Sequence, residues 1–324
     1  MLFIFLGIAL IWIIKRHDTQ VWKIWKIPKT QVKAYTKEFY YYSHPLFTYA
    51  VIGLVVGIFD RWLLQYFSGS VEQGFYGLSY QIGAVCFLFT SAMTPLITRE
   101  FAIAYANKDI QQMAHLFRRY IPMLYGIAAF FSCFIAVHAQ NVVFIFGGNK
   151  FQDAYMPVAI MAFYPIHQTY GQLSGSVFYA TGQTRLYRNL GIIFMILGLP
   201  VTYLLIAPSD KMGLNAGSTG LAIKMVALQF LGVNAQLYFN AKLLNLSFKK
   251  YLAHQLLCVI VLFSLAFVIS RIVTHIWLSP NIFVNFLVNG IIYSFAVGFL
   301  TFFIPELFGL KKNDIRRLLK RIKK

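Results

Sequence analysis

Apolar residues along this chain gather in long runs that short polar connections separate. Several runs are about 20 residues long, the length at which an α-helix crosses a hydrocarbon core of about 30 Å. Lipid offers the backbone no hydrogen-bond partners, so a spanning segment has to be a helix or part of a closed barrel. The pattern predicts an all-α polytopic transmembrane helical bundle of about nine spans. The predicted spans are 2–14, 45–67, 73–98, 119–138, 154–180, 190–207, 218–241, 251–270 and 282–305.

Composition supports this class and excludes others. Apolar residues make up 59% of the chain and charged residues 12%, whereas soluble domains carry about 25% charged residues. The three cysteines, Cys86, Cys133 and Cys258, lie inside apolar runs without metal-ligand spacing, so we expect them to behave as small hydrophobes. Hydrolase, kinase, phosphate-loop and metal motifs are missing from the sequence. We therefore expect no enzyme, no catalytic residue, no metal site and no cofactor.

The basic excess is explained by membrane topology. Lys and Arg number 29 against 10 Asp and Glu, a net charge of +19, which in a soluble protein would suggest nucleic acid. Here nearly all the basic residues fall in alternate connections, as the positive-inside rule requires of cytoplasmic loops. We expect no nucleic-acid partner, a cytoplasmic C-terminus and Met1 outside. In the tail, 307–324, apolar residues at helical spacing predict a basic amphipathic helix on an anionic leaflet.

Three charged residues lie away from the ends of the predicted spans: Asp60, Arg61 and Lys224. A charge at membrane depth costs several kcal/mol by insertion scales, so such residues usually face a protein interior or a water-filled cavity. Asp60 and Arg61 are consecutive, about 100° apart on a helix, and cannot simply pair with each other. Asp60 and Lys224 have similar predicted depths and are a possible pair, although Lys224 could instead snorkel to the surface.

Polar residues also cluster around Pro165, in the segment YPIHQTYGQLSGS. Proline frees backbone groups and kinks a helix at membrane depth. Tyr164, His167 and Gln168 could therefore line a sugar path or relay protons. The alternative is helix packing, which two glycines at GxxxG spacing in the same segment favour.

Arg99 and Glu100 follow the second long span, at its predicted cytoplasmic edge. Charged residues at a span end are more often interfacial anchors than moving parts. We expect an anchor, with a gate as the alternative.

Several of these stretches carry a family resemblance. They are the proline that opens the span at 45, Asp60–Arg61, the Gly-Phe-Tyr at 74–76 and TPLITRE with the basic connector after it. ATGQTRLYRN and GLNAGSTGLAIKMVALQFLG add a small-Gly-x-Thr-basic junction and a Gly-x-small-Gly-x-Ala helix start. Together they resemble the oligosaccharide-lipid flippase branch of the multidrug and polysaccharide exporter superfamily.

The resemblance implies a division of the chain. Members of that family commonly have 12 or 14 helices in two lobes of six. Residues 1–14 would be the last helix of a truncated N-terminal lobe, and 15–44 a basic cytoplasmic interlobe linker. Residues 45–241 would form the six-helix C-terminal lobe, 242–306 an additional helix pair, and 307–324 the tail.

The resemblance also implies a function. The chain would be part of a flippase that moves a polyprenyl-diphosphate-linked oligosaccharide across the cytoplasmic (inner) membrane by alternating access, for surface polysaccharide such as O-antigen. Its partners would be this lipid-linked oligosaccharide, membrane lipids and glycan assembly enzymes. Arg61 would bind the diphosphate, because a guanidinium suits a phosphate fork, and its alternative role is a structural ion pair with another helix. The alternatives are a cation-coupled drug exporter of the same superfamily, a polytopic polysaccharide polymerase, and a fragment without transport activity.

Overall fold

A computed structural model describes residues 7–8, 11–12, 15–16, 28–276 and 281–310. These residues form helices, turns and connections, and no strand occurs among them. The prediction of an all-α fold is confirmed. The chain divides into two compact units, 1–47 and 48–324. The site described below lies entirely in the second unit.

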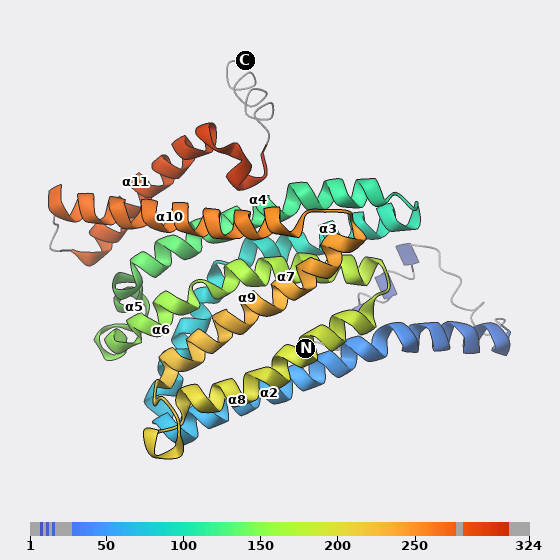
Figure 1. The fold of residues 1–324 in the computed structure, drawn as a ribbon, viewed down its shortest axis with the longest axis horizontal. Helices are drawn as coiled ribbons and strands as arrows, with labels where there is room; N and C mark the ends of the chain where they lie inside the picture. The colour runs from blue at the N-terminus through green and yellow to red at the C-terminus, as the bar shows by residue number, and fades with distance from the viewer. Residues whose placement is uncertain (1–6, 9–10, 13–14, 17–27, 277–280, 311–324) are drawn as a thin grey trace. The chain divides into compact units, whose positions relative to one another are not determined.

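The helices follow one another with short connections (Figure 1). Short 3₁₀ turns lie at Asn149–Ala154, Ser209–Lys211 and Pro305–Phe308. The α-helices are α2 (Lys29–Val85), α3 (Leu88–Ala106), α4 (Ile110–Val137), α5 (Ala139–Gly147), α6 (Tyr155–Met161), α7 (Tyr164–Ala180), α8 (Thr184–Ile206), α9 (Gly217–Leu243), α10 (Phe248–Ile276) and α11 (Ile282–Phe303).

Among the described residues, six helices are long and apolar enough to cross a membrane: α2, α4, α8, α9, α10 and α11. The protein is therefore a helical membrane protein. The predicted span 2–14 and the predicted tail helix lie largely outside the described residues.

Two predicted spans are interrupted in the structure. The span expected at 73–98 is divided between the end of α2 and α3, with the break after Val85. The span expected at 154–180 is divided between α6 and α7, and Pro165 lies in the first turn of α7. A proline is well tolerated at a helix start because it has no amide to donate. The helix is thus interrupted at a short turn just before this proline.

A third change of direction lies inside α2, at Gly69, which has φ 85° and ψ 176°. Only glycine adopts such a conformation readily. Glu72 follows this kink and accepts a hydrogen bond from the backbone amide of Ser218 at 2.7 Å, at the start of α9. An added Cβ at Gly217 would lie 2.7 Å from the Glu72 carboxylate. The two glycines thus permit the contact that fixes where α9 begins.

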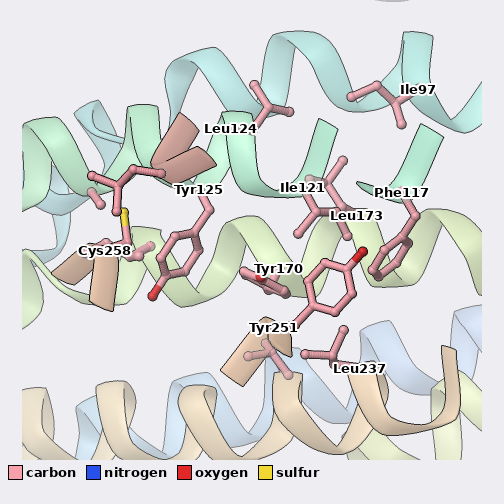
Figure 2. Close-up of a cluster of buried hydrophobic side chains, with 14 of the residues drawn as sticks. Ile97, Phe117, Ile121, Leu124, Tyr125, Tyr170, Leu173, Leu237, Tyr251 and Cys258 are labelled. Carbon is pink, nitrogen blue, oxygen red and sulfur yellow. The ribbon is translucent and has the colours of Figure 1, made fainter. Parts of the chain in front are cut away.

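The largest core lies where α3, α4, α7, α9 and α10 meet. Figure 2 shows Tyr125 of α4 and Tyr170 of α7 in its centre, with Leu237 of α9 and Tyr251 of α10 on one side. The rings of Tyr125 and Tyr170 meet edge to face, with centroids 5.0 Å apart. Tyr125 donates its hydroxyl hydrogen to the carbonyl of Gln255. This core holds α7 and α9 in place, and both helices contribute to the site.

Candidate functional site

A cavity of about 490 Å³ lies between α2, α7, α8 and α9, with one residue from α3. Apolar helices surround it, yet a large part of its wall is polar. The lining residues used below are Tyr49, Asp60, Thr94, Tyr164, Gln168, Gln172, Tyr179, Tyr187, Lys224, Gln229 and Gln236. Helices α2 and α8 run antiparallel to α7 and α9 along the cavity. Asp60 and Lys224 lie at one end, which we call the ion-pair end, and Tyr49, Tyr179 and Tyr187 lie at the other, the tyrosine end.

The ion-pair end joins three helices at one carboxylate. Lys224 of α9 contacts Asp60 of α2, with Nζ 2.5 Å from Oδ2. Thr202 of α8 donates its hydroxyl hydrogen to Oδ1 of Asp60 at 2.8 Å. Asp60 and Lys224 are both only 5% exposed. The predicted pair is confirmed, and snorkelling of Lys224 is excluded.

Gly198 of α8 makes room for this pair. A Cβ added there would lie 2.9 Å from Cε of Lys224 and 3.3 Å from its Nζ. The lysine stem therefore crosses α8 at a position without a side chain, one helical turn from Thr202. As Asp60 and Lys224 are the only charged residues among those lining the cavity, their opposite charges leave the described wall electrically neutral.

Amide side chains line the middle of the cavity. Gln229 of α9 donates to Gln168 of α7, and Thr94 of α3 donates to Gln172 at 2.9 Å. Gln236 of α9 is only 7% exposed, and within the described part of the chain its Oε1 has no hydrogen-bond partner. A buried amide oxygen without a donor costs about 1–3 kcal/mol. The wall therefore offers an acceptor to a hydroxyl or amide group in the cavity.

Three tyrosines form the other end. The ring centroid of Tyr187 lies 5.0 Å from that of Tyr49 and 5.1 Å from that of Tyr179. Two glycines allow this approach. A Cβ at Gly191 would lie 2.1 Å from the Tyr49 ring, and one at Gly175 would lie 3.2 Å from the Tyr187 ring.

The structure places four of the predicted site residues in the cavity wall: Asp60, Lys224, Tyr164 and Gln168. His167 is not among the lining residues. It packs against Phe230, with ring centroids 5.0 Å apart.

Arg61 also lies outside the cavity lining. It is exposed, with its guanidinium carbon 5.9 Å from the ring centroid of Tyr80. Tyr80 in turn approaches Tyr164 of the cavity wall, with centroids 6.4 Å apart. Arg61 is thus one aromatic ring away from the cavity.

Arg99 and Glu100 are exposed on α3 and do not line the cavity. Their roles as anchor or gate remain predictions.

The GxxxG segment was expected either to line a path or to pack against another helix, and one of its glycines does both. A Cβ at Gly171 would lie 3.0 Å from Val233, so this glycine packs against α9, and Gly171 also lines the cavity.

Several residues of the site were not predicted from the sequence. They are Thr202 at the ion pair, the three tyrosines of the tyrosine end, and Gln172, Gln229 and Gln236. A hydroxyl or amide within an apolar run was the available signal for Thr202, Gln229 and Gln236, since such groups seek a partner in lipid. The tyrosines lie near the ends of the predicted spans, where tyrosine is commonly interfacial, so their positions gave no signal of a cavity.

Chemically, the cavity offers amide and hydroxyl groups, aromatic faces and no net charge, a combination that fits an uncharged polyhydroxylated group. No family model, curated protein or solved structure matches the chain.

Proposed function

We propose that this chain belongs to a membrane transporter that moves a lipid-linked oligosaccharide between leaflets, as a flippase for surface polysaccharide synthesis. The observation that carries the proposal is the net-neutral cavity lined by tyrosines and glutamines within an apolar helix bundle. Sugar hydroxyls need donors and acceptors in pairs, and amides and tyrosine hydroxyls supply both. A buried acceptor without a partner, Oε1 of Gln236, is what such a substrate would satisfy.

The diphosphate of the substrate needs a different location. A group of about two negative charges gains little from a wall where Asp60 already neutralises Lys224. Arg61 is exposed, and among the described residues its guanidinium has no hydrogen-bond or ion-pair partner. A charge at this depth is costly against lipid. We assign the diphosphate to Arg61, at the edge of the sugar cavity, and expect water or a further protein surface to solvate the guanidinium otherwise.

The charge distribution of the connections supports placing the protein in the cytoplasmic (inner) membrane with its C-terminus inside. Transport would proceed by alternating access of this bundle against a second lobe.

A cation-coupled exporter is the second candidate, because a buried carboxylate such as Asp60 is the kind of group that binds a coupling ion. The ion pair with Lys224 at 2.5 Å counts against it, since that carboxylate already has a cation.

The test is photolabelling in membranes that contain the full chain. The probe is a polyprenyl-diphosphate disaccharide with a diazirine on its sugar, and adducts are mapped by mass spectrometry. We expect labelled peptides from α7, α8 or α9, competition by unlabelled disaccharide lipid, and weaker labelling in Gln236→Leu. Labelling restricted to lipid-facing residues, or competition by an organic cation but not by the disaccharide lipid, would contradict the proposal.

Arg61 gives a second measurement, glycan export in cells. Arg61→Lys keeps the charge and loses the planar fork, so export should fall partially, and Arg61→Ala should reduce it further. Arg271→Ala is the matched control, because Arg271 is an exposed arginine whose guanidinium also lies over a ring, Phe267, at 5.1 Å. Normal export by Arg61→Ala at a normal protein level would return Arg61 to a packing role.

A further inference from the structure

A second cavity, of about 520 Å³, opens where α10 begins. Its rim carries Arg118 of α4 and Lys250 of α10, together with Ser247 from the connection between α9 and α10. Among the described residues that line it, none is acidic. The rim is therefore strongly cationic. This cavity shares no lining residue with the first cavity.

The backbone adds to the positive potential of this rim. Helix α10 starts at Phe248. The amide of Lys250 donates to the carbonyl of Ser247, and the amides that precede it are groups of the kind that bind anions at a helix start. Ser247 precedes that start and also lines the cavity. An arginine, a lysine, a hydroxyl and a helix N-terminus together match the oxygens of a phosphate.

Beneath the rim, the cavity has an apolar floor that side-chain packing holds in place. The floor is made by Pro122, Leu246 and Tyr251. Tyr251 is only 8% exposed, and its ring meets Phe117 edge to face at 5.4 Å, as Figure 2 shows. The cavity is thus cationic at the rim and apolar below.

Its position suits the boundary of a membrane. Both α4 and α10 are candidate membrane spans, and the cavity lies within their first few turns. Ring nitrogen Nε2 of His254, which also lines the cavity, is 3.0 Å from the carbonyl oxygen of Leu307. Three residues separate Leu307 from the lysine- and arginine-rich end of the chain. Basic pockets between spans at this depth bind anionic lipid headgroups.

We propose that this cavity binds the headgroup phosphate of an anionic phospholipid, with Arg118 and Lys250 on the phosphate and the apolar floor against the glycerol and upper acyl chain. The site is separate from the proposed transport cavity and does not depend on the proposed function.

The test uses the full chain, purified in a non-ionic detergent and titrated with dioleoylphosphatidylglycerol while bound lipid is counted by native mass spectrometry. Each lysine or arginine close to an anionic headgroup contributes about 1 kcal/mol to lipid binding, and the contribution falls off with distance. Removing both in Arg118→Gln/Lys250→Gln should therefore weaken the first bound lipid roughly 30-fold. Lys108→Gln/Lys242→Gln removes the same charge from exposed positions outside the cavity, and should change the affinity only a few-fold.

A second variant keeps the charges and fills the space. Leu246→Trp should abolish the preference for phosphatidylglycerol over dioleoylphosphatidylcholine while the protein stays monodisperse. The proposal is overturned if phosphatidylcholine binds equally tightly, or if the control pair weakens binding as much as the cavity pair. It is also overturned if inorganic phosphate displaces the lipid at equal concentration, because the site would then hold a free anion.

Discussion

The buried pair of Asp60 and Lys224 should make a large and strongly coupled contribution to stability. Both side chains are almost completely buried, and each is the other's counter-ion at 2.5 Å. Removing one partner of such a pair leaves a buried charge without compensation and costs about 3–5 kcal/mol. We expect a loss of that size in Lys224→Met, whose side chain fills a similar volume.

Two companion variants separate the charge effect from other losses. Asp60→Asn/Lys224→Met removes both charges, and the asparagine oxygen can still accept the hydroxyl of Thr202. Replacing a whole buried pair is often close to neutral, so the double variant should be more stable than Lys224→Met alone. Thr202→Val removes one hydrogen bond to a charged group and should cost about 1.5–3 kcal/mol.

The assay is the free energy of unfolding in mixed micelles, obtained by titrating sodium dodecyl sulfate and following helical circular dichroism. Lys242→Met serves as the control, because Lys242 is an exposed lysine on the same helix, and should change stability by less than about 0.5 kcal/mol. The reasoning would be refuted if the stability loss of Lys224→Met fell within the control range. It would also be refuted if the loss of the double variant equalled the sum of the losses of Asp60→Asn and Lys224→Met measured singly.

The other predictions concern close approaches and hydrogen bonds between helices. Gly191→Ala should destabilise the fold by about 1–3 kcal/mol, because the added Cβ would lie 2.1 Å from the Tyr49 ring. The control is Gly77→Ala, whose added Cβ would meet nothing within 4 Å. It should be neutral or stabilising in the same detergent titration. Thr94→Val removes the bond to Gln172 and should cost about 0.6–1.7 kcal/mol, the range for such bonds between membrane helices. A loss of several kcal/mol would show that Thr94 does more than hold the two helices together.

The apolar pattern was sufficient to predict the class of the fold, because a run of about 20 apolar residues has few alternatives in lipid. It also indicated the ion pair as a possibility, since Asp60 and Lys224 are rare charges at similar depths, but it left snorkelling of Lys224 open. It could not separate Gln168, which lines the cavity, from His167, its neighbour, which packs against Phe230. Consecutive residues differ by about 100° on a helix, and only the neighbouring helices decide which of them faces the cavity.

Hydropathy also could not reveal the two helix breaks, because the residues around them are apolar on both sides. The structure shows that the breaks lie against each other. A Cβ at Gly83, beside the first break, would lie 3.2 Å from the carbonyl oxygen of Met161, beside the second. A side chain at position 83 would therefore crowd the interrupted backbone of the other helix.

Beyond the breaks, α3 and α7 are joined by three hydrogen bonds that repeat along both helices. Their polar partners are Thr90 with Thr169, Thr94 with Gln172, and Thr98 with Ser176. The three threonines of α3 are four residues apart, so they lie on one face of the helix. Apolar surface gives membrane helices no preference for one neighbour over another, because lipid tails are equally apolar. Sparse polar positions at helical spacing therefore determine that α3 packs on α7, and this pairing sets the wall that Thr94 and Gln172 contribute to the cavity.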